Sequence, residues 1–188
     1  HTRKKMRMIK TKMESINFDE KVIENLKTED LVAYKQANYI QKHSKLSLYN
    51  NTYSEYYPIG EDYFNSLKKE LLKAKHYIFL EFFIVEEGVM WNSILDILKE
   101  KAKNGVEVRV MYDGMCVLAL LPYFYPKMLE AEGIKCKMFA PIRPVFSTYY
   151  NNRDHRKIMV IDGKVAFTGG TNLADEFITQ KVRFGHWK

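Results

Sequence analysis

The chain has 188 residues, of which 46% are hydrophobic and 28% charged, and its formal net charge is +7. This length and hydrophobic content suffice for one substantial α/β core with an appended helical segment, and we find neither an apolar run of transmembrane length nor a secretory signal peptide. The two isolated cysteines exclude a disulfide framework, and the five histidines lack paired metal-ligand spacing, so we expect a reducing compartment, no metal and no cofactor.

The first twelve residues carry most of the charge. They contain six basic residues and no acid, so the rest of the chain has a net charge of only +1. A nearly neutral globular part argues against sequence-independent DNA binding, and we expect no nucleic-acid partner. The basic start is either a disordered tail or a juxtamembrane cluster that faces anionic lipid. Its basic residues are Arg3, Lys4, Lys5, Arg7, Lys10 and Lys12.

Helical patterns follow in residues Asp19–Lys27 and Glu29–Lys42, with Thr28 as the boundary between them. We assign residues 1–49 to a basic juxtamembrane segment and this helical lead-in. A stretch rich in tyrosines and turn residues then opens the main domain, which we expect to cover residues 50–188.

From Gly60 onward, helical and strand patterns alternate. Apolar residues recur twice at helical spacing, and each stripe is followed by an apolar strand pattern. A third helix and strand repeat the order, and such alternation predicts an α/β domain with a mixed sheet covered by helices. The stripes are Phe64, Leu67, Leu71, Ala74 and Trp91, Ile94, Leu95, Leu98, Ala102; the strands are Tyr77–Val85, Val106–Tyr112 and Ile134–Phe139; the third helix is Leu121–Glu132.

Two features of this region have competing interpretations. Glu81 lies mid-strand among apolar residues, where an unpaired carboxylate would be costly. It either lines the substrate cavity or pairs with an Arg or Lys, and we favour the pairing. The apolar stretch Met115–Pro126 is too short to span a bilayer. We expect most of it to pack in the core, with an interfacial membrane contact near the site as the alternative.

A spaced set of polar and glycine residues comes next. They fit the pattern H-x-K-x4-D-x6-GG-x-N, which occurs once in the chain. Two apolar, β-branched runs around Asp162 and Gly163 predict a pair of strands, Arg156–Ile161 and Val165–Thr168, joined by a hairpin turn. The set comprises His155, Lys157, Asp162, Gly169, Gly170 and Asn172.

This pattern suits phosphodiester chemistry. His155 and Lys157 are two residues apart on a strand, so both side chains leave the same face. A neutral imidazole is a nucleophile, and a lysine beside it holds the non-bridging oxygens and neutralises charge as it develops. Gly169 and Gly170 have no Cβ, so the backbone there can approach a ligand closely.

Thr171 or Asn172 begins a short helix, expected over Leu173–Thr179, whose free N–H groups and dipole favour an anion. Asn172 either caps this helix or hydrogen-bonds the phosphate, and the two roles are compatible. Asp162 is explained equally well by catalysis and by the turn, because Asp often precedes Gly in turns. A lone His and Lys on a strand are usually surface residues, so the functional assignment of both depends on the joint pattern.

The motif resembles the signature of the phospholipase D superfamily, whose members act on phosphodiesters through a phosphohistidine and build one active site from two motif copies. Further segments resemble bacterial cardiolipin synthases. The resemblance implies an α/β, phospholipase D-like half-domain with a mixed β-sheet flanked by helices. It also implies His155, Lys157 and Asp162 as catalytic residues, and Gly170 and Asn172 as substrate-binding residues. The segments are Ile78–Gly88, Met111–Gly114, Gly133–Phe139, Asn152–Lys157 and Arg183–Lys188.

The implied reaction is a two-step transfer between two phosphatidylglycerol molecules. His155 attacks the phosphorus of the first lipid, and glycerol leaves with a proton from the histidine of a second motif. A glycerol hydroxyl of the second lipid then attacks the phosphatidyl-histidine. Either histidine can be the nucleophile in this scheme. We expect this chain to begin after a pair of membrane helices and to stop inside the first catalytic half, so that alone it lacks a complete site.

The implied partners are phosphatidylglycerol or another anionic phospholipid, a membrane surface, and a second motif half supplied in cis or by a dimer mate. The resemblance implies a place at the cytoplasmic face of the bacterial cell membrane. Two alternatives stay open: a single-motif phosphodiesterase or nuclease that dimerises to unite two motifs, and a non-catalytic fragment that binds anionic lipid. The nearly neutral body and the Gly-His-Trp ending argue against the nuclease.

Overall fold

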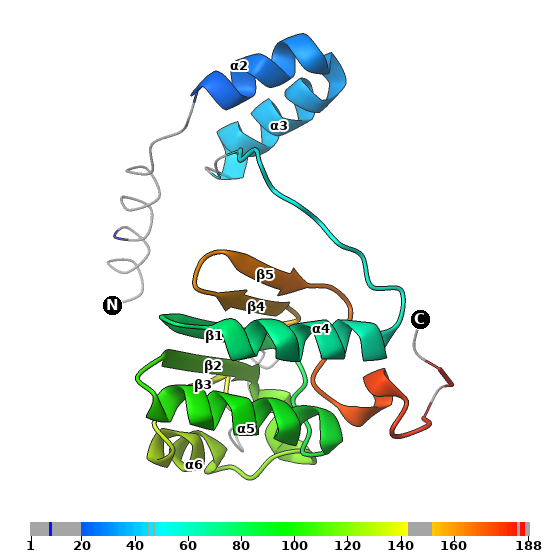
Figure 1. Ribbon diagram of the computed structural model, residues 1–188. Helices are drawn as coiled ribbons and strands as arrows, with labels where there is room; N and C mark the ends of the chain where they lie inside the picture. The colour runs from blue at the N-terminus through cyan, green and yellow to red at the C-terminus, as the bar shows by residue number, and fades with distance from the viewer. Residues whose placement is uncertain are drawn as a thin grey trace. The chain divides into compact units, whose positions relative to one another are not determined.

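The computed structural model describes residues 8, 20–44, 46, 48–142, 152–183 and 185–186. The basic side chains of the first twelve residues lie outside this description, as do Phe184, Trp187 and Lys188. The chain divides into two compact units, His1–Glu55 and Tyr56–Lys188, and each is described by itself (Figure 1).

The first unit contains a helix pair, and Asp30 separates the two helices. Oδ1 of Asp30 accepts the N–H groups of Val32 at 2.8 Å and Ala33 at 2.9 Å, as short polar side chains do at helix starts. The boundary expected at Thr28 is wrong, because its hydroxyl donates back to the carbonyl of Asn25 at 2.8 Å and the helix continues past it. The helices are α2 (Glu20–Glu29) and α3 (Leu31–Ser44).

The second unit is built on a five-stranded sheet with the order β3-β2-β1-β4-β5. Strands β1, β2 and β3 are parallel, whereas β4 is antiparallel to both β1 and β5. The expected α/β class with a mixed sheet flanked by helices is therefore confirmed (Figure 1). The strands are β1 (Tyr77–Phe82), β2 (Glu107–Asp113), β3 (Lys135–Phe139), β4 (Lys157–Ile161) and β5 (Val165–Thr168).

Helices cover one face of this sheet, as Figure 1 shows for α4 and α5. Alternate strand residues are buried beneath them, such as Ile78 and Leu80 of β1. Their neighbours Phe79 and Glu81 face a hollow on the opposite side of the sheet. No helix within the described ranges is long and apolar enough to cross a membrane. The helices are α4 (Gly60–Lys73), α5 (Val89–Lys103), α6 (Tyr125–Ala131) and the 3-10 turns η1 (Gly114–Leu118) and η3 (Asp175–Ile178).

Two elements are shorter than the sequence predicts. The strand expected over Tyr77–Val85 ends at Phe82. Val85 instead forms an isolated bridge with Leu173. The helix expected over Leu121–Glu132 is the shorter α6, which has Pro126 in its first turn. Proline is favoured there because its missing N–H would have no partner within the helix.

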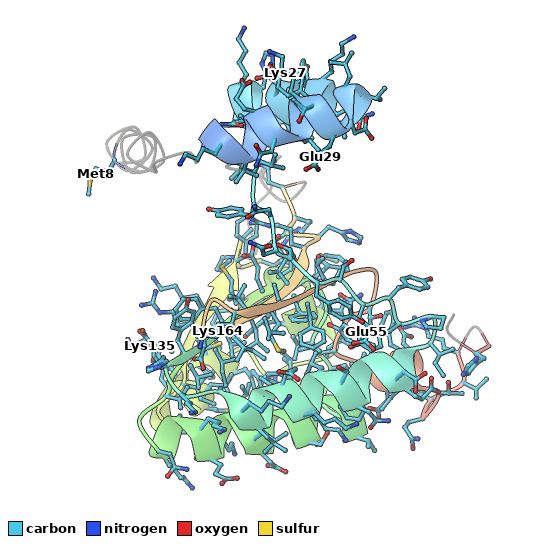
Figure 2. All side chains as sticks on the ribbon, turned by 45° about the horizontal axis from the view of Figure 1, so that its top comes forward. Met8, Lys27, Glu29, Glu55, Lys135 and Lys164 are labelled. Atoms are coloured by element: carbon cyan, nitrogen blue, oxygen red, sulfur yellow. The ribbon has the colours of Figure 1, made fainter. Side chains whose placement is uncertain are left out.

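The two ends of the sheet differ. The C-terminal ends of β1, β2 and β3 meet the start of β4, because Lys157 lies opposite Phe82 in the antiparallel pair. The other end holds the start of β3 and the β4–β5 turn, which Lys135 and Lys164 mark in Figure 2. Ligand sites in open sheets lie outside the carboxyl ends of parallel strands, so the first end is the candidate site.

Candidate active site

His155 and Lys157 meet on the ring of Phe83, just past the end of β1. The ring centroids of His155 and Phe83 are 4.7 Å apart, and Nζ of Lys157 lies 5.0 Å from the Phe83 centroid. The strand expected to begin at Arg156 begins at Lys157, so His155 precedes it. The two predicted side chains nevertheless lie together on one aromatic ring, and the imidazole is exposed to solvent.

The side chain of Lys157 is held almost out of solvent. The residue is 5% exposed, and its Nζ donates a 2.8 Å hydrogen bond to the carbonyl oxygen of His155. Desolvation lowers the pKa of Lys157, and the charge of Asp154 opposes part of that shift. A lysine ammonium has three N–H groups, and among the described residues the carbonyl oxygen of His155 accepts a hydrogen bond from one of them. The others are suited to the anionic oxygens of a phosphate.

Asp113, the last residue of β2, anchors the segment that carries His155. It is fully buried, and its Oδ2 accepts the backbone N–H of Asp154 at 2.9 Å. Its Oδ1 accepts the N–H of Met115 at 2.8 Å and Nη1 of Arg153 at 3.2 Å. Sequence reasoning missed Asp113; the available signal was an Asp-Gly pair directly after a strand pattern.

Glu81, the next-to-last residue of β1, belongs to a cluster of charged side chains beside the motif. Its Oε1 lies 2.5 Å from Nη2 of Arg156, an ion pair without well-aligned hydrogen-bond geometry. Nε of Arg156 also donates to Oδ1 of Asp154 at 2.9 Å. Glu81 therefore pairs with an arginine, as we favoured, and Asp154 pairs with Arg156 rather than with His155. Glu81 also lines the hollow on the sheet face opposite α4 and α5.

The pKa values of the two carboxyl groups in this cluster are shifted in opposite directions. Burial, followed by the hydrogen bond with Asp154 and its charge, raises the pKa of Glu81 to about 7. Burial also disfavours the ionised form of Asp154, but hydrogen bonds with Glu81 and Arg156 outweigh it, so the pKa of Asp154 is lowered. Below about pH 7, Glu81 therefore keeps a proton that it can donate to the ionised Asp154.

Glu81→Gln is expected to remove a pH dependence of folding stability. Because its pKa is raised in the folded state, protonated Glu81 stabilises the fold below its unfolded pKa of about 4.3, and this contribution is lost as pH rises through about 7. Asp154, whose pKa is lowered, contributes its own change only below that range. Relative to Glu81→Gln, the wild-type free energy of unfolding should fall by about 1 kcal/mol or more between about pH 5 and about pH 8. Urea unfolding of both proteins measures this difference, and a constant difference would contradict the raised pKa.

Asn172 ties the glycine-rich segment to the chain just past β1. It is 5% exposed, and its Oδ1 accepts the N–H of Ile84 at 3.0 Å. The N–H of Leu173 donates to the carbonyl oxygen of Ile84 at 3.1 Å. Since Phe83 directly precedes Ile84, Asn172 helps to hold the ring on which the two motif side chains lie.

The helix expected over Leu173–Thr179 is wrong in extent. Only the four-residue 3-10 turn η3 forms, after Ala174, so Asn172 is not its cap. An anion site at this helix start is not supported, because so short a helix has little dipole. Gly169 and Gly170 are exposed, and a Cβ added to Gly169 would meet no atom within 4 Å. The backbone there faces open space, and phosphate contacts from Gly170 and Asn172 stay predictions.

Asp175, which sequence reasoning also missed, caps the helix that follows β1. Its Oδ2 accepts the N–H of Val89 at 2.9 Å, and its Oδ1 accepts the N–H of Met90 at 2.8 Å. The packing is close, because a Cβ on Gly88 would lie 2.5 Å from Oδ2 of Asp175. The residues after the glycine pair therefore fix the start of α5 as well as the end of β1.

Asp162 lies at the far end of β4 from Lys157, roughly 16 Å along the strand. Its carboxylate accepts the backbone N–H groups of Lys75, His76 and Tyr77, each at 2.8 Å. The hydrogen bond from Tyr77 is the largest cause that lowers the pKa of Asp162 to about 2. The structure therefore does not bring Asp162 to the other two predicted catalytic side chains. It holds the β4–β5 turn against the start of β1.

Asp162→Ala is expected to destabilise the fold by about 2–3 kcal/mol, because three backbone N–H groups lose their acceptor and alanine disfavours the positive φ of 52°. Asp162→Asn keeps one oxygen and tolerates this φ, so it should cost about 1 kcal/mol. The stabilising contribution of Asp162 is present above about pH 3.9 and is lost as pH falls through about 2. Chemical denaturation measures these effects. Loss of turnover at unchanged stability in Asp162→Asn would instead assign Asp162 a role in the chemistry.

Metal-ligating side chains do not cluster in the part of the chain that the structure describes. There, no group of three or more His, Cys, Asp or Glu side chains could hold a metal ion. Cys116 and Cys136 are both free and buried. Burial raises the pKa of both thiols, so neither ionises readily near neutral pH.

Known proteins resemble this chain over most of its second unit. A family model described as "Cardiolipin synthase, PLD-like domain" matches residues 67–181. An uncharacterized protein of Streptococcus mutans is 53% identical over 171 residues, which are 91% of this chain and 37% of that protein. A cardiolipin synthase of Geobacillus kaustophilus is 42% identical over 130 residues, which are 69% of this chain and 26% of that enzyme. Among solved structures, NucT from Helicobacter pylori aligns with a TM-score of 0.49 and 17% identity, over 65% of this chain and 74% of NucT.

The chain spans 26% to 37% of the length of these two curated relatives. The family match includes every motif position from His155 to Asn172 and the strand end that carries Phe83. Since this match covers more than half of the chain, the chain belongs to the family of cardiolipin synthase phospholipase D-like domains.

Proposed function

We propose that the chain supplies one half of an active site that transfers a phosphatidyl group between two phosphatidylglycerol molecules and yields cardiolipin and glycerol. The observation that carries the proposal is the pairing of an exposed His155 with a buried Lys157 on the ring of Phe83. An imidazole in this position is open to an approaching phosphorus atom, while the ammonium is fixed beside it. The cardiolipin synthases among the relatives support a phospholipid as the substrate.

The proposed reaction has two displacement steps at phosphorus. An imidazole nitrogen of His155 forms a bond to phosphorus, and the bond from phosphorus to the glycerol oxygen breaks. The histidine of a second motif protonates the departing glycerol. That histidine then takes the proton from a glycerol hydroxyl of the second lipid, whose oxygen attacks phosphorus and breaks the phosphorus–nitrogen bond. The same scheme runs with the two histidines exchanged.

The second motif comes from outside these 188 residues in this proposal, because the chain contains the pattern once. A continuation of the natural chain can supply it in cis, and a dimer mate can supply it in trans. We place the reaction at the cytoplasmic face of the bacterial membrane, which the six basic residues among the first twelve support through attraction to anionic lipid. Membrane flotation of the natural protein tests the location, and recovery solely in the soluble fraction would contradict it.

A dimeric phosphodiesterase or nuclease is the second candidate, and the single motif copy is the observation that favours it. The net charge of +1 outside the first twelve residues argues against nucleic acid as its substrate. Size-exclusion mass separates the candidates. A dimer of this chain that hydrolyses a generic phosphodiester, with activity lost in Lys157→Ala, would favour the second candidate.

Lys157→Met tests the proposal in the full-length natural protein. It should lower the rate of cardiolipin formation by about 100- to 1,000-fold, because the fixed positive charge beside the transferred phosphate is lost. Stability should hold or rise, because a buried ammonium is replaced by an apolar side chain of similar length. Lys164→Met, an exposed lysine in the β4–β5 turn, is the matched control and should retain full activity. Equal rates for Lys157→Met and Lys164→Met would contradict the role of Lys157.

A further inference from the structure

We infer that the segment between β2 and the end of α6 docks on the surface of an anionic phospholipid bilayer beside the candidate active site; this rests on the proposed phospholipid substrate. The second unit exposes nine large apolar side chains among its described residues, and five of them fall within residues 115–128. Exposed apolar clusters of this kind mark protein or membrane contacts. We call these five the apolar rim: Met115, Leu118, Tyr123, Phe124 and Met128.

The rim begins at the end of the sheet where His155 lies. Met115 follows β2 almost directly, and its N–H donates to Oδ1 of Asp113 at 2.8 Å. The other oxygen of that carboxylate holds the N–H of Asp154, the residue before His155. One buried carboxylate therefore joins the start of the rim to the motif segment.

Tyr125 holds the later part of the rim near the same sheet end. Its ring meets the ring of Tyr112, near the end of β2, edge-on with centroids 6.3 Å apart. Its hydroxyl accepts the indole N–H of Trp91 at 2.6 Å, and all three side chains are buried. Tyr123 and Phe124 directly precede this anchor, so they too lie close to the end of β2.

Buried residues alternate with the exposed side chains of the rim along this segment. Cys116, Leu121 and Tyr125 are buried, while Leu118 is 61% exposed and Phe124 is 64% exposed. The expectation that most of Met115–Pro126 packs in the core is therefore wrong, because six of these twelve residues are exposed. The backbone is anchored, and the exposed side chains are presented from it.

The composition of the rim fits an anionic lipid surface. Residues 114–128 contain one charged residue, Lys127, and no acid. Nζ of Lys127 lies 5.8 Å from the Phe124 ring centroid, and aromatic rings with a nearby lysine are typical of the membrane interface. The rim therefore combines apolar area for the acyl boundary with charge of one sign.

Site-specific labelling tests insertion directly. Phe124→Cys carries an environment-sensitive fluorophore, and Leu72→Cys on α4, at a position 54% exposed, is the matched control. The two native cysteines are buried, so the introduced thiol takes the label. On phosphatidylglycerol vesicles, emission at residue 124 should rise about twofold or more and be quenched by lipids brominated in the acyl chain, with no change at residue 72. No change at residue 124, or an equal change at both positions, would overturn the inference.

Substitution of the rim gives an independent measurement. The double variant Leu118→Ser, Phe124→Ser should bind phosphatidylglycerol vesicles about tenfold more weakly or worse, and Leu72→Ser should bind normally. If the double variant instead breaks a lipid-free dimer and keeps its vesicle affinity, the rim is an interface between copies and the inference is wrong.

Failure of docking and failure of the proposed function can be told apart. In the full-length protein the double variant should turn over short-chain, water-soluble phosphatidylglycerol at the wild-type rate. If the double variant turns over this substrate normally and also binds vesicles as tightly as the wild type, the docking inference is wrong and the proposed reaction is not affected. Rim-dependent vesicle binding without any turnover by the wild type would support docking and contradict the proposed transfer reaction.

Discussion

His155→Ala is expected to lower cardiolipin formation by the full-length natural protein about 1,000-fold or more. Without this imidazole the protein lacks either the nucleophile or the acid of the proposed reaction, and loss of one member of a catalytic unit removes most of its rate enhancement. The fold should be unaffected within about 0.5 kcal/mol, because His155 is an exposed side chain whose ring contact is with Phe83. Cardiolipin and released glycerol measure the rate, and thermal unfolding measures the stability.

His76→Ala is the matched control for this experiment. His76 is also exposed, but it lies at the opposite end of the sheet, where its backbone N–H binds Asp162. It should form cardiolipin at the wild-type rate with the same stability. If His155→Ala forms cardiolipin as fast as His76→Ala does, His155 has no part in the reaction.

Asp113→Ala is expected to destabilise the fold by about 3–5 kcal/mol, because it removes the fully buried carboxylate that pairs with Arg153. The N–H groups of Met115 and Asp154 lose their acceptor as well. Activity should fall further than the folded fraction, since the segment that carries His155 loses its anchor. Urea unfolding, and transfer rates corrected for the folded fraction, separate the two effects.

Two control variants accompany Asp113→Ala: the conservative Asp113→Asn and the surface substitution Asp96→Ala. The asparagine keeps one side-chain oxygen, so it should cost less than the alanine. Asp96 is an exposed residue of α5, and its substitution should change stability by no more than about 0.5 kcal/mol. If Asp113→Ala is as stable as Asp96→Ala, the anchoring role of Asp113 is wrong.

Much of the fold was predictable because local patterns specify it. The apolar stripes around Leu67 and Ile94 correspond to α4 and α5, whose inward side chains are fully buried. The strand over Val165–Thr168 was predicted with its observed bounds. Where prediction failed, as at the end of β1, the deciding contact was the distant bridge from Val85 to Leu173. A local pattern does not contain that pairing.

In the candidate site, too, local spacing was predictable and contacts between distant residues were not. The spacing of His155 and Lys157 was enough to predict that they lie together, whereas the anchor Asp113 and the cap Asp175 act on residues about 40 and 85 positions away along the chain. Asp162 could have been separated from the site by arithmetic alone. Five residues of strand from Lys157 to Asp162 span roughly 16 Å. That distance is too long for both side chains to touch one phosphate.

In the proposed reaction, His155 and Lys157 form half of a phosphatidyl-transfer site that a second motif completes. Release of glycerol from phosphatidylglycerol by this chain, with its mass determined in the same solution, should be compared with release by a protein in which a second motif is joined to it in cis. We expect no release by the monomeric chain, and we expect release by the two-motif protein that is lost in His155→Ala. Cardiolipin formation by the monomeric 188-residue chain, or undiminished formation by the two-motif His155→Ala protein, would contradict it.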